Sequence, residues 1–246
     1  MNISKVWYIT GASQGLGLIL VKKLLEKGCR VAATSRDARA LARAVGLIDR
    51  ERFLPLAVDL NNPDCIDESI QQTLAAFGRI DVVVNNAGYG MAGTIEETPD
   101  HDIRNIFDVN VLATIDVVKR VLPVMRNQRS GYIINIGSVA GFAGPPGWSV
   151  YSSTKAAVAG FSEVIAQDVR EFGIKVTIAE PSGLCTKQAA SQDRAAQIFM
   201  ELAENPEPPI HLFLGNDAND RASKKLVDMS GKLEQWRSIT AGTDFK

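Results

Sequence analysis

The sequence predicts an α/β fold, in which a doubly wound parallel sheet of seven strands is flanked by helices on both faces. Two observations carry this prediction. Short apolar runs rich in β-branched residues alternate with longer segments of helical period, which is typical of right-handed strand–helix–strand crossovers. The chain has 246 residues, 46% of them hydrophobic and 22% charged. This length and composition suit one α/β domain with a sizeable core.

The N-terminal half is expected to supply four strands and four helices. The strands are Val6–Thr10, Arg30–Ser35, Phe53–Val58 and Ile80–Asn85. Leu16–Lys27 is expected to be the first helix, because its leucines recur on one helical face, and Gly28 follows as a C-cap. Further helices are expected at Asp37–Val45, Pro63–Phe77 and Asp100–Asn127.

The C-terminal half continues the alternation. Strands are expected at Gly131–Gly137, Lys175–Ala179 and Ile210–Leu214, with helices at Tyr151–Phe172 and Asp193–Ala203. The last segment, about 217–246, is interpreted as one surface helix followed by a tail. The sequence contains no internal repeat and no low-complexity linker, so residues 1–246 are expected to form a single domain.

Composition excludes several classes of function. The formal net charge is −1 with no block of like charge, which argues against nucleic acid and anionic membrane surfaces as partners. No apolar run is long enough to cross a bilayer, and residues 1–5 lead directly into a strand without a signal-peptide pattern. The three cysteines are odd in number and far apart, and the two histidines have no metal-ligand spacing. We therefore expect a cytoplasmic protein without a metal site.

A glycine-rich turn joins the first strand to the first helix. In a parallel sheet, ligands bind beyond the carboxyl ends of the strands, so this turn lies where a ligand is expected. Glycines let the backbone approach a pyrophosphate, and the helix N-terminus offers free amides. The alternative is that the glycines are needed only for the turn itself. We predict a dinucleotide site that includes Gly11, Ser13, Gln14, Gly15, Leu16 and Gly17.

The end of the second strand bears on the choice between NAD and NADP. NAD-selective enzymes usually place a carboxylate there to bind the ribose 2′-hydroxyl. Here Ser35 and Arg36 come first, and Asp37 follows only afterwards. A hydroxyl and a guanidinium suit a 2′-phosphate, so NADP(H) is favoured over NAD(H). The alternative is that Arg36 is a solvated loop residue.

Together these motifs resemble those of the short-chain dehydrogenase/reductase family. The resemblance rests on TGASQGLG at Thr10–Gly17, Asn85-Asn86-Ala87-Gly88 after the fourth strand, Asn110, Ser138, and a tyrosine–lysine pair, Tyr151 and Lys155. It implies a Rossmann domain that binds NAD(P) and moves a hydride between nicotinamide and a small-molecule carbonyl or secondary alcohol. The C-terminal part is similar to a bacterial branch close to the 17β-hydroxysteroid dehydrogenase type.

The tyrosine–lysine pair is the predicted chemical centre. Free tyrosine has a pKa of about 10, which makes it a poor base at neutral pH. Lys155 lies one helical turn from Tyr151 on the same face. Its ammonium is expected to favour the phenolate, so that Tyr151 exchanges protons nearer to working pH. Taken alone, such a pair is usually an ordinary polar helix surface, and the other motifs decide in favour of catalysis.

The resemblance assigns further roles residue by residue. Ser138 would hold the substrate oxygen, although a serine there could also simply cap a turn, and Asn110 would support a water chain through Lys155. The remaining cofactor contacts that it implies are Asp59, Leu60, Asn86, Ala87, Gly88, Pro181 and Thr186, with Tyr151 and Lys155 also touching the cofactor. For the Asp59 side chain, a cap or Asx turn before Pro63 is an equally good interpretation.

Two features depart from the family pattern. Pro181 is followed by Ser182 and then Gly183, where the family usually has Pro-Gly. The substrate-covering lid, about residues 183–205, is also short. A short lid would leave the pocket open, or a mobile segment could be absent from the sequence. The pattern therefore leaves a second function open, an NADP-binding redox-sensing regulator without turnover.

Assembly is expected by the same resemblance. The family packs the helices that correspond here to Asp100–Asn127 and Tyr151–Phe172 against a symmetry mate, which implies a homodimer or a homotetramer. The small residues Ala156, Ala157, Ala159 and Gly160 would permit close approach. The alternative is that these four residues are buried against the sheet.

Overall fold

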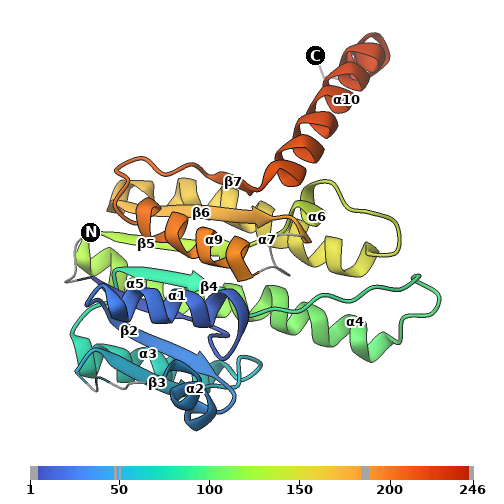
Figure 1. Ribbon diagram of the computed structural model, residues 1–246. Coiled ribbons are helices and arrows are strands. Elements are labelled where there is room, and N and C mark those ends of the chain that lie inside the picture. Colours follow the sequence, from blue (N-terminus) through green and yellow to red (C-terminus); the bar gives the residue numbers. More distant parts are fainter. Residues whose placement is uncertain (1–4, 47–48, 50, 184–188, 244–246) are drawn as a thin grey trace.

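A single seven-stranded parallel sheet forms the centre of the molecule. The computed structural model describes residues 5–46, 49, 51–183 and 189–243. The strand order is β3-β2-β1-β4-β5-β6-β7, and every neighbouring pair is parallel (Figure 1). The chain runs outward in one direction from β1 and then in the other from β4. This confirms the predicted doubly wound α/β architecture.

The strands lie close to the predicted segments. Their bounds are β1 Val6–Ile9, β2 Arg30–Ser35, β3 Phe53–Ala57, β4 Val82–Asn85, β5 Gly131–Ile136, β6 Ile174–Pro181 and β7 His211–Leu214. Most of β1, β2, β4 and β5 is buried, as expected for strands covered on both faces. Within β1, Trp7 and Ile9 enter one core cluster, whereas Val6 and Tyr8 enter the other. The alternation follows the two-residue period of a strand.

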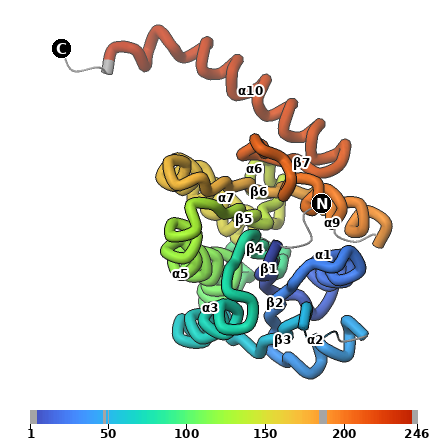
Figure 2. The backbone as a smooth tube through the Cα atoms, turned by 90° about the vertical axis from the view of Figure 1, so that its left-hand side faces the viewer, coloured from blue at the N-terminus to red at the C-terminus, as the bar shows by residue number. Residues whose placement is uncertain are grey.

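Helices cover both faces of the sheet (Figure 2). On one face lie α1 (Gly15–Glu26), α2 (Ala38–Val45) and α9 (Ala189–Leu202), whose buried side chains share a cluster with Trp7 and Ile9. On the other face lie α3 (Pro63–Phe77), α5 (Ala113–Gln128) and α7 (Ser149–Asp168). No helix in the described part of the chain is long and apolar enough to span a membrane.

Local chemistry explains where several helices begin and end. Gly28 has a φ of +80° and follows the last turn of α1, as its predicted role at the helix end requires. Asp37 caps α2 by accepting hydrogen bonds from the amides of Arg39 and Ala40. Asn62 caps α3 immediately before Pro63. These caps fix the turns that lead away from β2 and β3.

The structure corrects two predicted helices and adds one that was not predicted. The segment 100–127 is not one continuous α-helix, because a π-helix at Asp108–Leu112 separates α4 (Asp100–Phe107) from α5. The helix expected at Asp193–Ala203 begins earlier, at Ala189. A short helix that was not predicted, α6 (Val139–Phe142), follows β5. The predicted C-terminal surface helix is α10 (Asn216–Thr240), which projects away from the body of the molecule (Figure 1).

Candidate functional site

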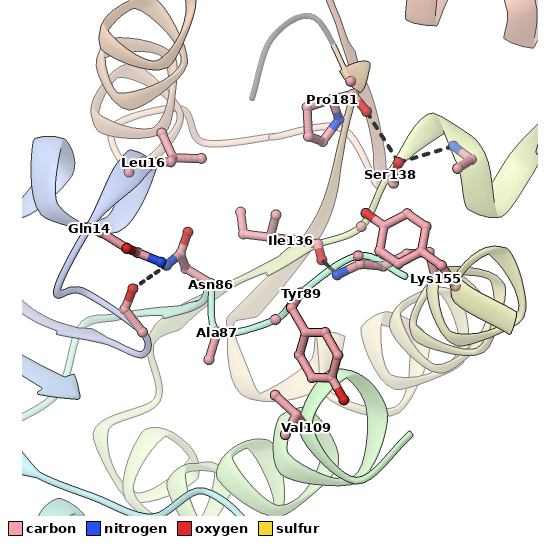
Figure 3. Close-up of a pocket in the computed structure, with 18 of the residues that line it drawn as sticks. Gln14, Leu16, Asn86, Ala87, Tyr89, Val109, Ile136, Ser138, Lys155 and Pro181 are labelled. Atoms are coloured by element: carbon pink, nitrogen blue, oxygen red, sulfur yellow. Dashed lines mark hydrogen bonds between the residues drawn. The ribbon is translucent and has the colours of Figure 1, made fainter. Parts of the chain in front are cut away.

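One large cavity lies beyond the carboxyl ends of the strands. Its volume is about 930 Å³, and its wall comes from the turns after β1, β2, β3, β4, β5 and β6 together with parts of α7, α9 and α10. The predicted site residues that line it are Gly11, Ser13, Gln14, Gly15, Leu16, Ser35, Arg36, Asp59, Leu60, Asn86, Ala87, Gly88, Ser138, Tyr151, Lys155 and Pro181. Figure 3 shows Gln14 and Leu16 across the cavity from Ser138 and Lys155.

The glycines of the first turn are required by space as well as by conformation. Gly11 has a φ of +64°, and a Cβ there would lie 2.7 Å from Ala87 Cα. A Cβ on Gly17 would lie 2.6 Å from Asn86 Nδ2 and 2.9 Å from the Gly11 oxygen. All three distances are too short for a Cβ to fit without movement of its neighbours. The turn is therefore packed directly against the segment that follows β4.

The segment after β4 is hydrogen-bonded to the glycine turn. Asn86 Nδ2 donates to the Thr10 oxygen at 3.0 Å and to the Gly11 oxygen at 2.9 Å. The amides of Asn86 and Ala87 both donate to Thr10 Oγ1, at 3.0 and 3.1 Å. Figure 3 shows Asn86 and Ala87 beside the turn. The two strand ends thus form one rigid wall.

This wall fits an anionic dinucleotide. Among the described residues, no side chain caps the N-terminus of α1, and its first turn contains no acidic residue, so the amides there face the cavity without a competing anion. A helix N-terminus of this kind favours a phosphate. Thr34 adds a buried hydroxyl in the cavity wall, and no hydrogen-bond partner reaches it from the described part of the chain. The residues present therefore suit a nucleotide cofactor.

The turn after β2 presents an arginine to the cavity, while its acidic residue is engaged elsewhere. Arg36 is exposed and lines the cavity wall. Asp37 Oδ1 accepts hydrogen bonds from the amides of Arg39 and Ala40, at 2.8 and 2.9 Å, and these bonds lower the pKa of the carboxyl. Ser35 Oγ donates to the main-chain carbonyl oxygen of Asp37 at 2.7 Å. The acidic residue at this strand end therefore serves as a helix cap.

Asp59 forms the Asx turn that was expected as the alternative to a cofactor contact, and it also lines the cavity. Its Oδ1 accepts a hydrogen bond from the Asn61 amide at 3.0 Å, which is an Asx turn. The side chain remains exposed at the cavity wall beside Leu60. The two interpretations are thus compatible in this structure.

Tyr151 and Ser138 meet at the other end of the cavity. The Tyr151 hydroxyl lies close enough to Ser138 for the serine to lower the pKa of the phenol, and both residues line the wall. Ser138 caps α6 through the Ala140 amide at 3.1 Å, and its Oγ also lies 3.4 Å from the Pro181 oxygen, as the dashed lines in Figure 3 show. The serine is therefore both a helix cap and the partner of the phenol. Its position is fixed by two separate backbone segments.

The pKa of Tyr151 differs from the prediction. Burial raises it, and the hydrogen bond to Ser138 partly opposes that rise. The Lys155 ammonium does not produce the lowering that the sequence predicted. Lys155 Nζ lies 5.8 Å from the centroid of the tyrosine ring and donates to the Ile136 oxygen at 2.8 Å. Desolvation therefore outweighs any attraction between the two groups.

Lys155 itself is strongly affected by its surroundings. The residue is only 5% exposed, and burial lowers the pKa of its ammonium to about 8. The hydrogen bond to the Ile136 oxygen keeps the amine at the cavity wall (Figure 3). A lysine with a pKa in this range is protonated at neutral pH but close to releasing its proton.

Asn110 lies within the π-helix that interrupts the predicted helix. Its Oδ1 accepts from the Tyr89 amide at 3.0 Å, and its Nδ2 donates to the Tyr89 oxygen at 2.9 Å and to Thr154 Oγ1 at 3.2 Å. A Cβ on Gly88 would lie 3.0 Å from Asn110 Oδ1 and 3.5 Å from Lys155 Nζ. Asn110 thus ties the loop after β4 to α7 beside the lysine. Its role in a water chain stays a prediction.

Several cavity residues were not predicted. Asp217 and Arg221 from α10 line the wall, and Arg221 also donates to the Ala143 oxygen. These residues lie far along the chain from every motif, so no local pattern could identify them. Trp148 also lines the cavity and packs edge-on against Tyr151, with their ring centroids 5.6 Å apart.

Most of the described part of the predicted lid is the helix α9. Residues 189–202 form α9, whose buried side chains, Phe199 among them, enter the core cluster beside α1 and not the cavity. Of the lid residues that the structure describes, Gly183 and Gln192 line the cavity. Thr186, the predicted nicotinamide contact, lies outside the described residues. Among the described residues, no cluster of three or more metal-ligating side chains is placed to hold an ion.

Comparison with known proteins is consistent with this geometry. The family profile described as short chain dehydrogenase matches residues 5–197. Oxidoreductase BOA17 of Botryotinia fuckeliana is 34% identical over 270 aligned residues, covering 97% of this chain and 98% of that protein. Because this chain has only 246 residues, that alignment includes positions at which only the relative has a residue.

Two solved structures have the same fold. A short-chain dehydrogenase from Streptomyces avermitilis has a TM-score of 0.89 and 31% identity, with 98% of each chain covered. A metagenomic short-chain oxidoreductase, solved in complex with NADP, has a TM-score of 0.76 and 29% identity. That match covers 85% of this chain and 96% of the other.

Proposed function

This chain belongs to the short-chain dehydrogenase family of oxidoreductases, and on that premise we propose that it is an NADP(H)-dependent reductase of carbonyl compounds. The observation that carries the proposal is that Tyr151, Ser138 and the buried Lys155 line the wall of the same cavity as the glycine turn. This arrangement places a proton donor and a nucleotide-binding turn around one space. The reverse reaction, oxidation of a secondary alcohol, uses the same groups.

The proton chemistry follows from the burial of the two titratable groups. Tyr151 has a raised pKa, so its hydroxyl keeps its proton at neutral pH and can give it to a carbonyl oxygen. Ser138 would hold that oxygen beside the phenol. Lys155, with a pKa of about 8, is then available to return a proton to the phenolate. The cofactor, when bound, supplies the hydride that the carbonyl carbon receives.

Residues along the cavity would divide the cofactor between them. The first turn of α1, with Ser13 to Leu16, would hold the pyrophosphate, and Ala87 with Gly88 would lie along the nucleoside. Arg36 would bind a 2′-phosphate. The occupied Asp37 carboxylate and the NADP complex of the metagenomic relative both support NADP over NAD. Pro181 and Lys155 line the nicotinamide end in this proposal.

Replacing Tyr151 by phenylalanine tests the proposal directly. We expect Tyr151→Phe to lower kcat by roughly 10²- to 10⁴-fold, which is the usual contribution of a general acid. Because the ring stays in place, NADPH affinity should change little. NADPH oxidation would be followed against a broad panel of ketones, aldehydes and steroids, and NADPH binding by fluorescence titration.

A second tyrosine of the same cavity supplies the control. Tyr89 also lines the wall, but its hydroxyl has no part in the proposed proton transfer. Tyr89→Phe should therefore retain most of the turnover. Equal losses in the two variants, or a loss of NADPH affinity in Tyr151→Phe comparable to its loss of turnover, would contradict the assigned role.

One observation favours a second candidate function, a redox-sensing regulator that binds NADP(H) without turnover. The segment between Pro181 and α9 is short, so little of the chain is available to cover the substrate end of the cavity. Water exclusion, on which hydride transfer depends, would then be poor. Tight NADPH binding without oxidation against every member of the panel would favour this alternative.

A further inference from the structure

The C-terminal helix α10 carries most of the exposed large hydrophobic side chains of the described chain. Ten large hydrophobic side chains are exposed, and six of them lie on this one helix. They are Leu226 (55% exposed), Val227 (75%), Met229 (45%), Leu233 (72%), Trp236 (53%) and Ile239 (66%). Figures 1 and 2 show α10 leaving the body at its base and extending into solvent.

Four of these side chains form one narrow stripe. Leu226, Met229, Leu233 and Trp236 follow one another at intervals of three, four and three residues, with Thr240 four residues further on. This is the spacing of the a and d positions of a heptad, which faces a second helix. Ala218 and Ala222, which are buried where α10 meets the body, lie on the same row. The stripe thus continues a face that is already packed.

The charges beside the stripe are balanced. Between residues 216 and 240 the sequence has five lysines or arginines and four aspartates or glutamates. Lys232 bonds Asp228 at 2.7 Å, and Arg237 bonds Glu234 at 3.3 Å, both within the helix. A helix that binds a membrane surface usually has a strongly basic polar face, which α10 lacks. A nearly neutral face is what a helix needs in order to meet its own copy, because any surplus charge would be doubled.

We propose that the stripe of α10, made of Leu226, Met229, Leu233 and Trp236, pairs with the same stripe of a second copy of this chain. A two-fold antiparallel pair matches the stripe with itself, because Leu226 then faces Trp236 of the second copy and Met229 faces its Leu233. The dipoles of the two helices also oppose each other. This contact uses a different part of the molecule from α5 and α7, where the family resemblance places the subunit contact.

The size of the contact predicts how it behaves. The segment from Ala222 to Thr240 is roughly 27 Å long at about 1.5 Å per residue. A seam of this length is short compared with a standard protein interface. The pair is therefore expected to dissociate on dilution, whereas an assembly through larger surfaces would persist.

The test is the molar mass of the full chain, measured by light scattering and sedimentation over a dilution series. Leu233→Glu places a charge in the stripe, and Val227→Glu is its matched control. Val227 is equally exposed on the same helix but lies off the stripe, and it receives the same charge. We expect Leu233→Glu and, separately, Trp236→Glu to halve the mass of the assembly, with Val227→Glu unchanged and the same far-UV spectrum for all.

Other occupants of the stripe give other results. Equal masses for wild type and Leu233→Glu at every concentration would overturn the proposal, as would an equal loss in Val227→Glu. Sedimentation of the wild type with anionic lipid vesicles, lost in Leu233→Glu while the mass stays constant, would assign the stripe to a membrane surface. Constant mass without vesicle binding would leave the stripe to a different protein and also overturn pairing.

Discussion

At one end of the cavity the wall is backbone, whereas at the other end it is side chains from scattered elements. The proposed cofactor end consists of the turns after β1, β2 and β4, and Asn86 and Thr10 join the first of these turns to the last. The proposed substrate end is assembled from Trp148 and Arg221, which come from the start of α7 and from α10. Tyr151 and Ser138 line the wall at that second end.

This difference separates what the fold fixes from what the individual sequence can vary. A close contact between two backbone segments, as between Gly11 and Ala87, tolerates almost no substitution because a Cβ has nowhere to go. Side chains that reach in from separate helices can change one at a time without disturbing the sheet. The cofactor end should therefore respond to mutation sharply, and the substrate end gradually.

The largest effect is expected from Gly17→Ala at the cofactor end. The added Cβ would lie 2.6 Å from Asn86 Nδ2 and 2.9 Å from a backbone oxygen, so the turn and the loop after β4 must move apart. We expect NADPH affinity to fall by roughly 100-fold, at the upper end of an overpacking cost. Fluorescence titration and thermal unfolding would measure the two losses.

A glycine in open space provides the comparison. Gly231 lies within α10, and a Cβ added there would meet no atom of the described residues within 4 Å. Gly231→Ala should leave NADPH binding unchanged and increase the stability of the helix, by up to ~1 kcal/mol. If Gly17→Ala bound NADPH as tightly as the wild type, the rigid contact between the two turns would not matter for the cofactor.

The sequence anticipated these two ends unequally, for physical reasons. The glycine turn, Asn86 and Tyr151 occupy fixed places relative to strands and helices, so local spacing identifies them. Arg221 enters the cavity only because β7 and α10 fold back beside α6, and Thr34 has no motif at all. The π-helix around Asn110 and the burial that raises the pKa of Tyr151 also depend on tertiary packing. No periodicity in the sequence reports either feature.

For the predicted oligomer contact, too, local spacing identified the residues but not their burial. Ala156, Ala157 and Gly160 are exposed on α7, and Ala159 is half-buried, so the alternative that this row is buried against the sheet is wrong for most of it. The small residues therefore remain available for a second copy. That α7 packs against a second copy stays a prediction.

A smaller effect is expected from Arg36→Leu. This variant tests the part of the cofactor end that would bind the 2′-phosphate. Arg36 is exposed, so its bond to a 2′-phosphate is partly screened by water, and its loss should weaken NADPH binding about tenfold. NADH has no such phosphate and should bind as before. The ratio of the two dissociation constants is the measurement. A parallel loss of NADH affinity would mean that Arg36 supports the turn and does not select the cofactor.

The smallest effect is expected at the substrate end, from Trp148→Ala. The indole packs edge-on against Tyr151, and a Cβ on Gly90 would lie 3.1 Å from it, so it fills the space between the phenol and the loop after β4. An aromatic pair of this kind contributes ~0.5–1.5 kcal/mol beyond area burial, so kcat/KM should fall roughly fivefold. The assay uses whichever carbonyl compound the wild type reduces, and NADPH affinity should remain unchanged because the indole lies outside the cofactor end. Ile95→Ala provides the control, since Ile95 is exposed on the same loop and does not line the cavity. A loss of NADPH affinity in Trp148→Ala as large as that in Gly17→Ala would show that the two ends form one rigid unit, because neither end of the wall would then tolerate substitution.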